Sequence, residues 1–176
     1  MVISPHDPTQ MAVQVAECVK LGKPYFYDVG QQVSNISDKD VRAGITHAKL
    51  LIVNDYEMGV IQEKTGWSED KIVQTVEIVV VTLGEKGSLV WNSGKKEIVG
   101  SLPNVKVQDP TGAGDAYRAG FLFGLVRGAE PVVCARLGSI TAAFCIESHG
   151  TQEHFFTMDQ FKERYKRQFG TLNILE

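Results

Sequence analysis

Cysteine is scarce in this 176-residue sequence, and long hydrophobic runs are missing. The three cysteines have no metal-binding spacing, and an odd number in apolar surroundings favours free, buried thiols in a reducing compartment. No apolar run approaches the length that crosses a membrane, and the N-terminus lacks the pattern of a signal peptide. The formal net charge of -3 gives no indication of a nucleic-acid-binding surface. These absences predict a soluble, cytoplasmic protein with neither a membrane nor a nucleic acid as its partner.

Two common nucleotide-binding signatures are missing as well. No Walker A loop of the form Gly-x-x-x-x-Gly-Lys-Ser/Thr occurs. A Rossmann fingerprint fails because Tyr117 occupies the position of its third glycine, which argues against a dinucleotide-dependent oxidoreductase. His149 and His154 have no cysteine or histidine cluster around them, so a zinc site has no support there.

Length and composition fit one ordinary globular domain over 1–176, with 43% hydrophobic and 22% charged residues. Short apolar runs alternate with helical patterns in the first half, and helices dominate the second. This order predicts an α/β fold with a mainly parallel sheet and helices on both faces. Strands are expected at 1–4, 25–29, 50–53, 77–83, 88–92 and 97–100, a loop at 30–32, and helices at 8–21, 38–48, 55–65, from 68, and at 114–127, 131–148 and 158–169.

The most informative segment is 109–116, Asp-Pro-Thr-Gly-Ala-Gly-Asp-Ala, which places a glycine-rich turn at the start of an apolar helix. Free N–H groups and the positive end of the helix dipole form an anion site at such a position. Gly112, Ala113 and Gly114 are predicted to offer N–H groups to phosphate oxygens, although a turn that needs glycine only for its dihedral angles is an alternative. Asp115 can act as a general base toward a hydroxyl, or it can simply complement the dipole.

This segment resembles the signature of the ribokinase-like (PfkB) family of carbohydrate and nucleoside kinases, which is close to Asp-Thr-x-Gly-Ala-Gly-Asp. In the family's order, Asn54–Glu57 resembles its Asn-x-x-Glu motif and 79–88 resembles its Thr-x-Gly-x-x-Gly segment. The resemblance covers essentially the whole chain. It implies the C-terminal, nucleotide-binding part of a ribokinase-like three-layer αβα sandwich, with the N-terminal part and the lid missing. The strings at 4–8, 28–32 and 150–154 are closest to the prokaryotic adenosine- or nucleoside-kinase-like branch.

The resemblance implies an ATP-dependent phosphotransferase that needs Mg²⁺. Asp115 would take the proton from the acceptor hydroxyl as that oxygen attacks the γ-phosphate. Glu57 would organise Mg²⁺ through water molecules, because magnesium keeps several of its waters, and Asn54 would lie near the triphosphate. A helix-capping pair is the alternative interpretation of Asn54 and Glu57.

Further site residues are implied by the same resemblance. Thr82, Gly84 and Gly87 match the turn that approaches the ATP phosphates and ribose, although a plain hairpin turn would explain them too. Asp109 and Thr111 match positions that in many relatives help bind a monovalent cation, K⁺, and a simple Asp-Pro-Thr turn competes with that interpretation.

The later ligands of that cation would fall around 147–150. Gly138 and Ala142 lie on a helix that borders the adenine pocket in the family, whereas close helix packing explains their small size equally well.

The acceptor is expected to be a nucleoside resembling adenosine, with a sugar as a close variant. A catalytically silent nucleotide-binding protein, completed by a separate N-terminal chain, is the alternative of a different class. If the chain is a fragment, its sheet is expected to expose an edge strand that favours a homo-oligomer.

Overall fold

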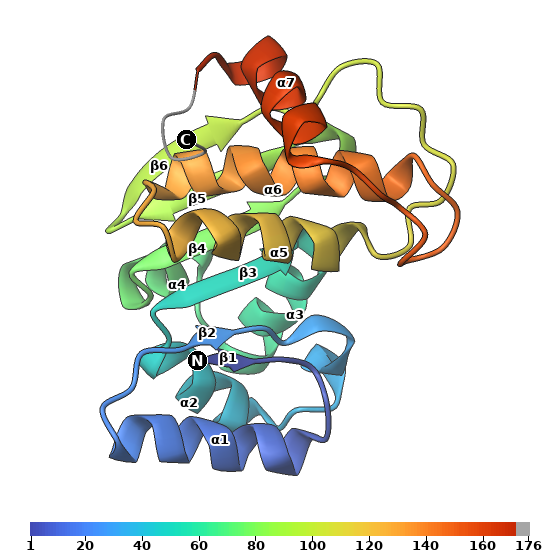
Figure 1. The fold of residues 1–176 in the computed structure, drawn as a ribbon. Coiled ribbons are helices and arrows are strands. Elements are labelled where there is room, and N and C mark those ends of the chain that lie inside the picture. Colours follow the sequence, from blue (N-terminus) through green and yellow to red (C-terminus); the bar gives the residue numbers. More distant parts are fainter. Residues whose placement is uncertain (172–176) are drawn as a thin grey trace. The chain divides into compact units, whose positions relative to one another are not determined.

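The structure is a computed structural model that describes residues 1–171 (Figure 1). The chain divides into two compact units, one formed by 1–84 with 89–97 and the other by 85–88 with the chain from 98 onward. The single domain expected over 1–176 stays a prediction. In the described part of the chain, no helix combines the length and the apolar character that a membrane span requires.

Within residues 1–171, six strands form one sheet in the order β1 to β6. The first four strands pair in parallel, with Val2 opposite Phe26, Leu50 opposite Ile78 and Asn54 opposite Thr82 in their respective pairs. The predicted α/β class with a mainly parallel sheet is confirmed. The elements are β1 (Val2–Ile3), α1 (Pro8–Lys20), β2 (Phe26–Tyr27), η1 (Gly30–Ser34), α2 (Asp38–His47), β3 (Leu50–Asn54), α3 (Asp55–Thr65), α4 (Glu69–Thr75), β4 (Ile78–Thr82), η2 (Gly84–Lys86), β5 (Ser88–Asn92) and β6 (Lys95–Val99).

The segment 30–32 differs from the sequence-based expectation of a loop, because it begins the short 3-10 helix η1. Gln32 N–H donates to the Val29 carbonyl at 3.1 Å, and Asn35 N–H donates to the Gln32 carbonyl at 2.8 Å. These bonds span three residues, which is the spacing of a 3-10 helix. Both β1 and β2 are also shorter than expected, with two residues each.

One hydrophobic core joins the strands and helices of the first unit. Alternate strand residues enter it, as expected from the period of two along a β-strand. The intervening residues of β3 and β4, such as Ile52 and Val80, are buried as well, which is typical of strands in parallel sheets. The core includes Ile3, Tyr27, Leu51, Val53, Val79 and Val81 from the strands and Met11, Ile45, Ile61 and Ile72 from α1 to α4.

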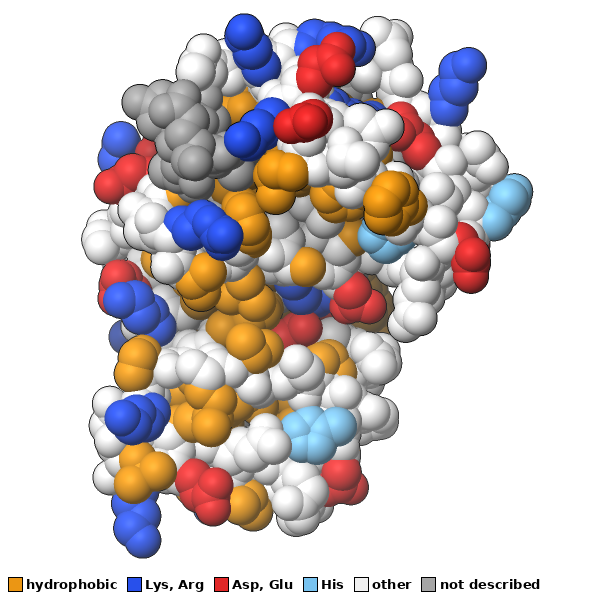
Figure 2. All heavy atoms as spheres, in the orientation of Figure 1, with side chains coloured by type: hydrophobic (Ala, Val, Ile, Leu, Met, Phe, Trp, Pro, Cys, Tyr) orange, Lys and Arg blue, Asp and Glu red, His pale blue; other side chains and the backbone are white. Residues whose placement is uncertain are grey.

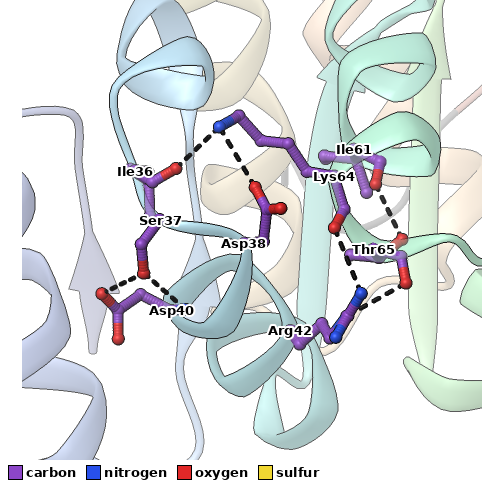
Figure 3. Close-up of polar contacts among 8 residues, drawn as sticks. All are labelled: Ile36, Ser37, Asp38, Asp40, Arg42, Ile61, Lys64 and Thr65. Carbon is purple, nitrogen blue, oxygen red and sulfur yellow. Dashed lines mark hydrogen bonds and ion pairs between the residues drawn. The ribbon is translucent and has the colours of Figure 1, made fainter.

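Polar contacts join the C-terminal end of α3 to α2 and to the residues just before α2 (Figure 3). Lys64 Nζ, near the end of α3, donates to the Ile36 carbonyl at 2.9 Å and lies 3.5 Å from Asp38 Oδ1. Arg42 Nε, on α2, donates to the Thr65 carbonyl at 3.0 Å. Carbonyls at the end of α3 lack intrahelical donors, so Arg42 satisfies one of them and fixes the two helices side by side.

In the second unit, α5 (Ala113–Leu125) and α6 (Pro131–Ile146) pack against each other along a row of glycines (Figure 1). A Cβ atom added at Gly120 would lie 2.7 Å from the Leu137 carbonyl oxygen and 2.9 Å from the Gly138 Cα atom. Real Cβ contacts are essentially never that short. The two helices therefore approach more closely than any residue larger than glycine at position 120 would permit. Leu137 and Ile140 of α6 also form a small core with Phe161 and Tyr165 of α7 (Met158–Phe169).

Candidate functional site

In the first unit, the candidate residues lie where two parallel strands end. Asn54 ends β3, Thr82 ends β4, and the two residues are opposite each other in the register. Thr82 Oγ1 donates to the Val53 carbonyl at 3.4 Å. In open α/β sheets, ligands bind outside the carboxyl ends of the strands. The structure therefore brings Asn54 and Thr82 together at the expected edge.

Asn54 and Glu57 form a reciprocal capping box at the start of α3. Asn54 Oδ1 accepts from the Glu57 N–H at 2.7 Å, and Glu57 Oε2 accepts from the Asn54 N–H at 2.8 Å. Glu57 is only 7% exposed. The capping alternative predicted from sequence is thus realised, and it fixes the glutamate side chain at the sheet edge.

Magnesium is implied by the family resemblance. The acidic side chains of the described residues fit it through bound water molecules only. The described residues contain no group of three or more His, Cys, Asp or Glu side chains that could hold a metal ion. A single carboxylate such as Glu57 can still orient water molecules of a magnesium shell, since Mg²⁺ uses few protein ligands and keeps several waters. The residues present fit a water-mediated site.

Gly84 and Gly87 both need glycine, for different reasons. Gly84 opens η2 with φ of 58°, and no atom lies within 4 Å of an added Cβ. Gly87 has φ of 90°, and an added Cβ would overlap the Val99 carbonyl oxygen and lie 2.8 Å from the Gly100 carbonyl carbon. Local geometry accounts for both positions, and their predicted approach to ATP stays a prediction.

The start of α5 is the candidate anion site of the second unit. Gly112 is its N-cap residue, with φ of 84°, a left-handed conformation that favours glycine. Ala113 N–H donates to the Pro110 carbonyl at 3.2 Å, and Ala116 N–H donates to the Gly112 carbonyl at 2.9 Å. The Ala113 N–H is therefore engaged within the turn. Gly114 lies in the same first turn, where α-helical geometry provides no intrahelical partner for the N–H group.

Asp115 projects from this first turn into solvent, with its side chain 87% exposed. The guanidinium of Arg118 lies 3.4 Å from Asp115 Oδ1, and the Arg118 side chain is only 15% exposed. Arg118 Nη1 would be 2.9 Å from a Cβ atom added at Gly114, so the guanidinium lies directly against the glycine turn. Sequence reasoning missed Arg118. The only signal was its spacing of three residues from Asp115, at which helical side chains become neighbours.

The Asp109 carboxylate accepts hydrogen bonds from two segments that are distant in sequence, the turn at Thr111 and the loop at Gly150. Its Oδ1 accepts from the Thr111 N–H at 2.9 Å, and its Oδ2 accepts from the Gly150 N–H at 2.9 Å. Hydrogen bonds from the Thr111 side chain, the Thr111 backbone and the Gly150 backbone lower the pKa of Asp109 to about 2. Asp109 and Thr111 are thus brought together, and their predicted cation role stays a prediction.

All three cysteines are buried and free, which the apolar surroundings predicted for Cys18 and Cys145. Cys145 Sγ lies 3.6 Å from the Thr111 carbonyl oxygen, and burial raises the pKa of the Cys145 thiol. A buried thiol with a raised pKa forms little thiolate, so a packing role explains this residue.

Gly138 and Ala142 lie on α6, where packing explains the glycine. A Cβ atom added at Gly138 would lie 2.8 Å from the Tyr117 carbonyl oxygen of α5. Ala142 is half-buried. Close helix packing accounts for Gly138, and an adenine-pocket role of both residues stays a prediction.

Each unit therefore gathers its own set of predicted site residues. The first brings together Asn54, Glu57 and Thr82 at the ends of β3 and β4, and the second brings together Asp109, Thr111, Gly112, Ala113, Gly114 and Asp115 at the start of α5.

Comparisons with known proteins assign the chain to a family. The nucleoside kinase of Methanocaldococcus jannaschii is 34% identical over 141 residues, which are 80% of this chain and 47% of that protein. The structure of a Burkholderia thailandensis nucleoside kinase, solved with inosine and also with ADP-inosine, has a TM-score of 0.92 at 32% identity in each state. The inosine complex covers 96% of this chain and 57% of the other; the ADP-inosine complex covers 96% and 53%.

The ribokinase-like fold is confirmed by a further structure. The M. jannaschii nucleoside kinase structure, an archaeal member of the ribokinase family, has a TM-score of 0.85 at 31% identity and covers 94% of this chain and 55% of the other. The chain spans about half the length of the curated relatives it matches. The model of the pfkB family of carbohydrate kinases matches residues 2–157, and the chain therefore belongs to this family.

Proposed function

We propose that this chain carries the nucleotide-binding and catalytic residues of an ATP-dependent nucleoside kinase. The observation that carries the proposal is the start of α5, where a glycine turn, an exposed carboxylate and a guanidinium occur together in a pfkB-family chain. The complexes of the B. thailandensis enzyme with inosine and ADP-inosine support a nucleoside as acceptor and an adenine nucleotide as the second ligand.

Asp115 is the general base of the proposed reaction. Its carboxylate accepts the proton of the acceptor hydroxyl while the hydroxyl oxygen forms a bond to the γ-phosphorus of ATP. The bond from that phosphorus to the bridging oxygen breaks, and the electron pair leaves with ADP. The 87% exposure of the Asp115 side chain leaves the carboxylate accessible to a hydroxyl group.

The turn at Gly112, Ala113 and Gly114 stabilises the negative charge that phosphoryl transfer spreads over the phosphate oxygens. The N–H groups of Gly112 and Gly114 and the α5 dipole provide fixed positive charge, and Arg118 adds a guanidinium beside them. Such fixed charges supply much of the rate enhancement in phosphoryl transfer.

The strand ends of the first unit bind the donor nucleotide in this proposal. Glu57 would hold water molecules of Mg²⁺, which would neutralise phosphate charge, and Asn54 would lie near the triphosphate. Thr82, Gly84 and Gly87 approach the ATP phosphates and ribose.

On α6, Gly138 and Ala142 border the adenine ring.

A sugar acceptor is the second candidate, because the matching family model is that of carbohydrate kinases. The cytoplasmic location expected from the sequence remains a prediction.

The test is ADP release from Mg·ATP by the purified chain, with inosine, adenosine and ribose compared as acceptors. We expect a nucleoside to be preferred, and Asp115→Asn to abolish turnover while ATP affinity stays within a few-fold. Asp159→Asn, an exposed aspartate in the first turn of α7, is the matched control and should keep full activity. Turnover that survives in Asp115→Asn contradicts the base assignment.

Nucleotide binding should be measured by calorimetry in parallel. Binding of ADP without turnover favours the alternative of a nucleotide-binding chain that needs a separate N-terminal chain. Failure to bind any adenine nucleotide contradicts the proposal as a whole.

A further inference from the structure

We propose that Asp109 is a positioning residue that fastens the anion-site turn directly to the α6 exit loop (147–151), with no need for a monovalent cation. This inference rests on the proposed function, because it concerns how the phosphate-binding turn is held in place. It also replaces the cation-binding role that the family resemblance implies for Asp109 and Thr111.

The first support is the use of both carboxylate oxygens. Asp109 Oδ1 accepts from the Thr111 N–H and Oδ2 accepts from the Gly150 N–H, each at 2.9 Å. Hydrogen bonds to an ionised acceptor are about twice as strong as neutral ones. The first bond shapes the turn that leads into α5, and the second crosses 41 residues of sequence to the α6 exit loop.

Backbone contacts complete the attachment. The Ile146 carbonyl at the end of α6 accepts from the Gln108 N–H at 2.8 Å and from the Asp109 N–H at 3.2 Å. A Cβ atom added at Gly112 would lie 3.2 Å from Thr151 and 3.3 Å from Cys145 Sγ, so the turn lies directly on this end of α6. The position of the Gly112 turn therefore depends on the position of the loop.

The α6 exit loop is held from its other side by α7. Glu147 accepts two hydrogen bonds from Arg164, at 2.7 and 2.8 Å, in the bidentate geometry that makes arginine–carboxylate pairs strong. The Arg164 guanidinium also lies over the Phe144 ring, 4.6 Å from its centre. The loop thus has one fixed attachment to α7 and one to Asp109.

Charge at this place argues against a cation as the fastener. Two carboxylates at the loop, Asp109 and Glu147, already accept hydrogen bonds from donors of the chain itself. The N–H groups of Thr111 and Gly150 and the N-terminal end of α5 present partial positive charge, which opposes the partial negative charge at the C-terminal end of α6. Donors of the chain itself therefore compensate the negative charge of Asp109 and Glu147 without a cation.

Amide hydrogen exchange of the isotope-labelled chain, followed by NMR in the absence of nucleotide, tests the fastening. In Asp109→Ala, the amides of Thr111 and Gly150 should exchange roughly tenfold faster, as expected for the loss of a charged acceptor. Asp109→Asn keeps one acceptor oxygen, and asparagine supports the same local turn as aspartate. It should therefore release Gly150 and leave Thr111 protected.

The cation is tested by repeating the exchange in potassium chloride and in choline chloride at equal ionic strength. Equal protection of Gly150 in both salts supports the inference, and protection that needs potassium overturns it. Unchanged exchange at Gly150 in both Asp109 variants overturns it as well. If Asp109→Ala does not fold, Asp109→Asn decides the test, and Asp159→Asn is the control whose Gly150 exchange should stay unchanged.

Titration with ADP separates this inference from the proposed function. In a preformed anion site, ADP should shift the Gly114 amide resonance at a lower concentration in the unmodified chain than in Asp109→Asn. Equal ADP titrations in the two proteins count against a positioning role of Asp109. No shift with ADP in the unmodified chain contradicts the proposed anion site, while the exchange pattern still decides how the turn is fastened.

Discussion

Gly112 combines two requirements for glycine, as Gly87 does: a positive φ and a crowded position for any Cβ atom. Its φ of 84° is a conformation that side chains disfavour, and the space beside it is filled by Thr151 and Cys145. Gly128, which follows α5 with φ of 75°, shares the first requirement but has no atom within 4 Å of an added Cβ. Comparing Gly112 with Gly128 therefore separates the cost of the left-handed backbone conformation from the cost of crowding around the Cβ atom.

Gly112→Ala should destabilise the chain more than Gly128→Ala. A left-handed conformation costs a residue with a Cβ about 1 kcal/mol, and this is the whole expected effect at Gly128. At Gly112 the crowded Cβ adds a further cost, for a total of about 2–3 kcal/mol. Urea denaturation of both variants measures the difference. Equal losses would show that Thr151 and Cys145 give way without cost.

The individual residues of the site differ in how far the sequence could predict them. The glycines at 112 and 114 follow from a local motif, and the structure gives Gly112 the positive φ that such a turn needs. The bond from Gly150 to Asp109 could not be predicted, because it joins residues 41 positions apart whose proximity depends on the packing of α5 on α6. The orientation of Arg118 was hidden for a similar reason, since a long side chain can point several ways from its helix.

At the scale of elements, α3 begins with residues to which two roles are assigned. The Asn54–Glu57 capping box stabilises the helix start, whereas the proposed function needs the charge of Glu57 for magnesium-bound water. Capping requires only an acceptor oxygen, and metal binding requires a carboxylate. Substitutions that keep one property and remove the other can distinguish the roles.

Glu57→Gln should destabilise the chain less than Glu57→Ala, because the amide oxygen still accepts from the Asn54 N–H. Turnover with Mg·ATP should fall at least roughly tenfold, since a neutral amide holds metal-bound water less well. Glu57→Ala removes both properties and should also cost about 1–2 kcal/mol of stability. Thermal unfolding and ADP release measure the two effects. Full activity in Glu57→Gln would contradict the magnesium role proposed for this residue.

Most elements could be predicted because their signals are local. The sequence expected α3 at 55–65 and α7 at 158–169, and both are confirmed with those bounds, since each begins with a capping box. The strands β1 and β2 are shorter than the apolar runs that predicted them. Hydrogen bonding to neighbouring strands, and not the sequence of one strand alone, decides where a strand ends. The 3-10 helix at 30–34 was missed, because no strong sequence pattern distinguishes such a short helix from a loop.

At the scale of the whole molecule, the two edge strands of the sheet, β1 and β6, carry different kinds of side chain. The strand β6 carries Lys95 and Lys96, and charged side chains on an edge oppose pairing with another sheet. The strand β1 carries Val2, 45% exposed, next to Met1, 72% exposed. Figure 2 shows hydrophobic side chains at the surface over β1. Among residues 1–171, β1 pairs with β2 alone, so its other edge presents unpaired backbone groups beside apolar side chains.

This edge should make the chain associate as its concentration rises, and Val2→Lys should weaken that association by placing a charge on β1. Val13→Lys is the matched control, because Val13 is also 45% exposed but belongs to α1 and not to a strand. Light scattering coupled to size-exclusion chromatography over a hundredfold concentration range measures the effect. A monomer at every concentration, or equal effects of the two lysines, would show that β1 does not mediate association. Dissociation by Val2→Lys alone would identify the β1 edge as the surface through which copies of this chain pair.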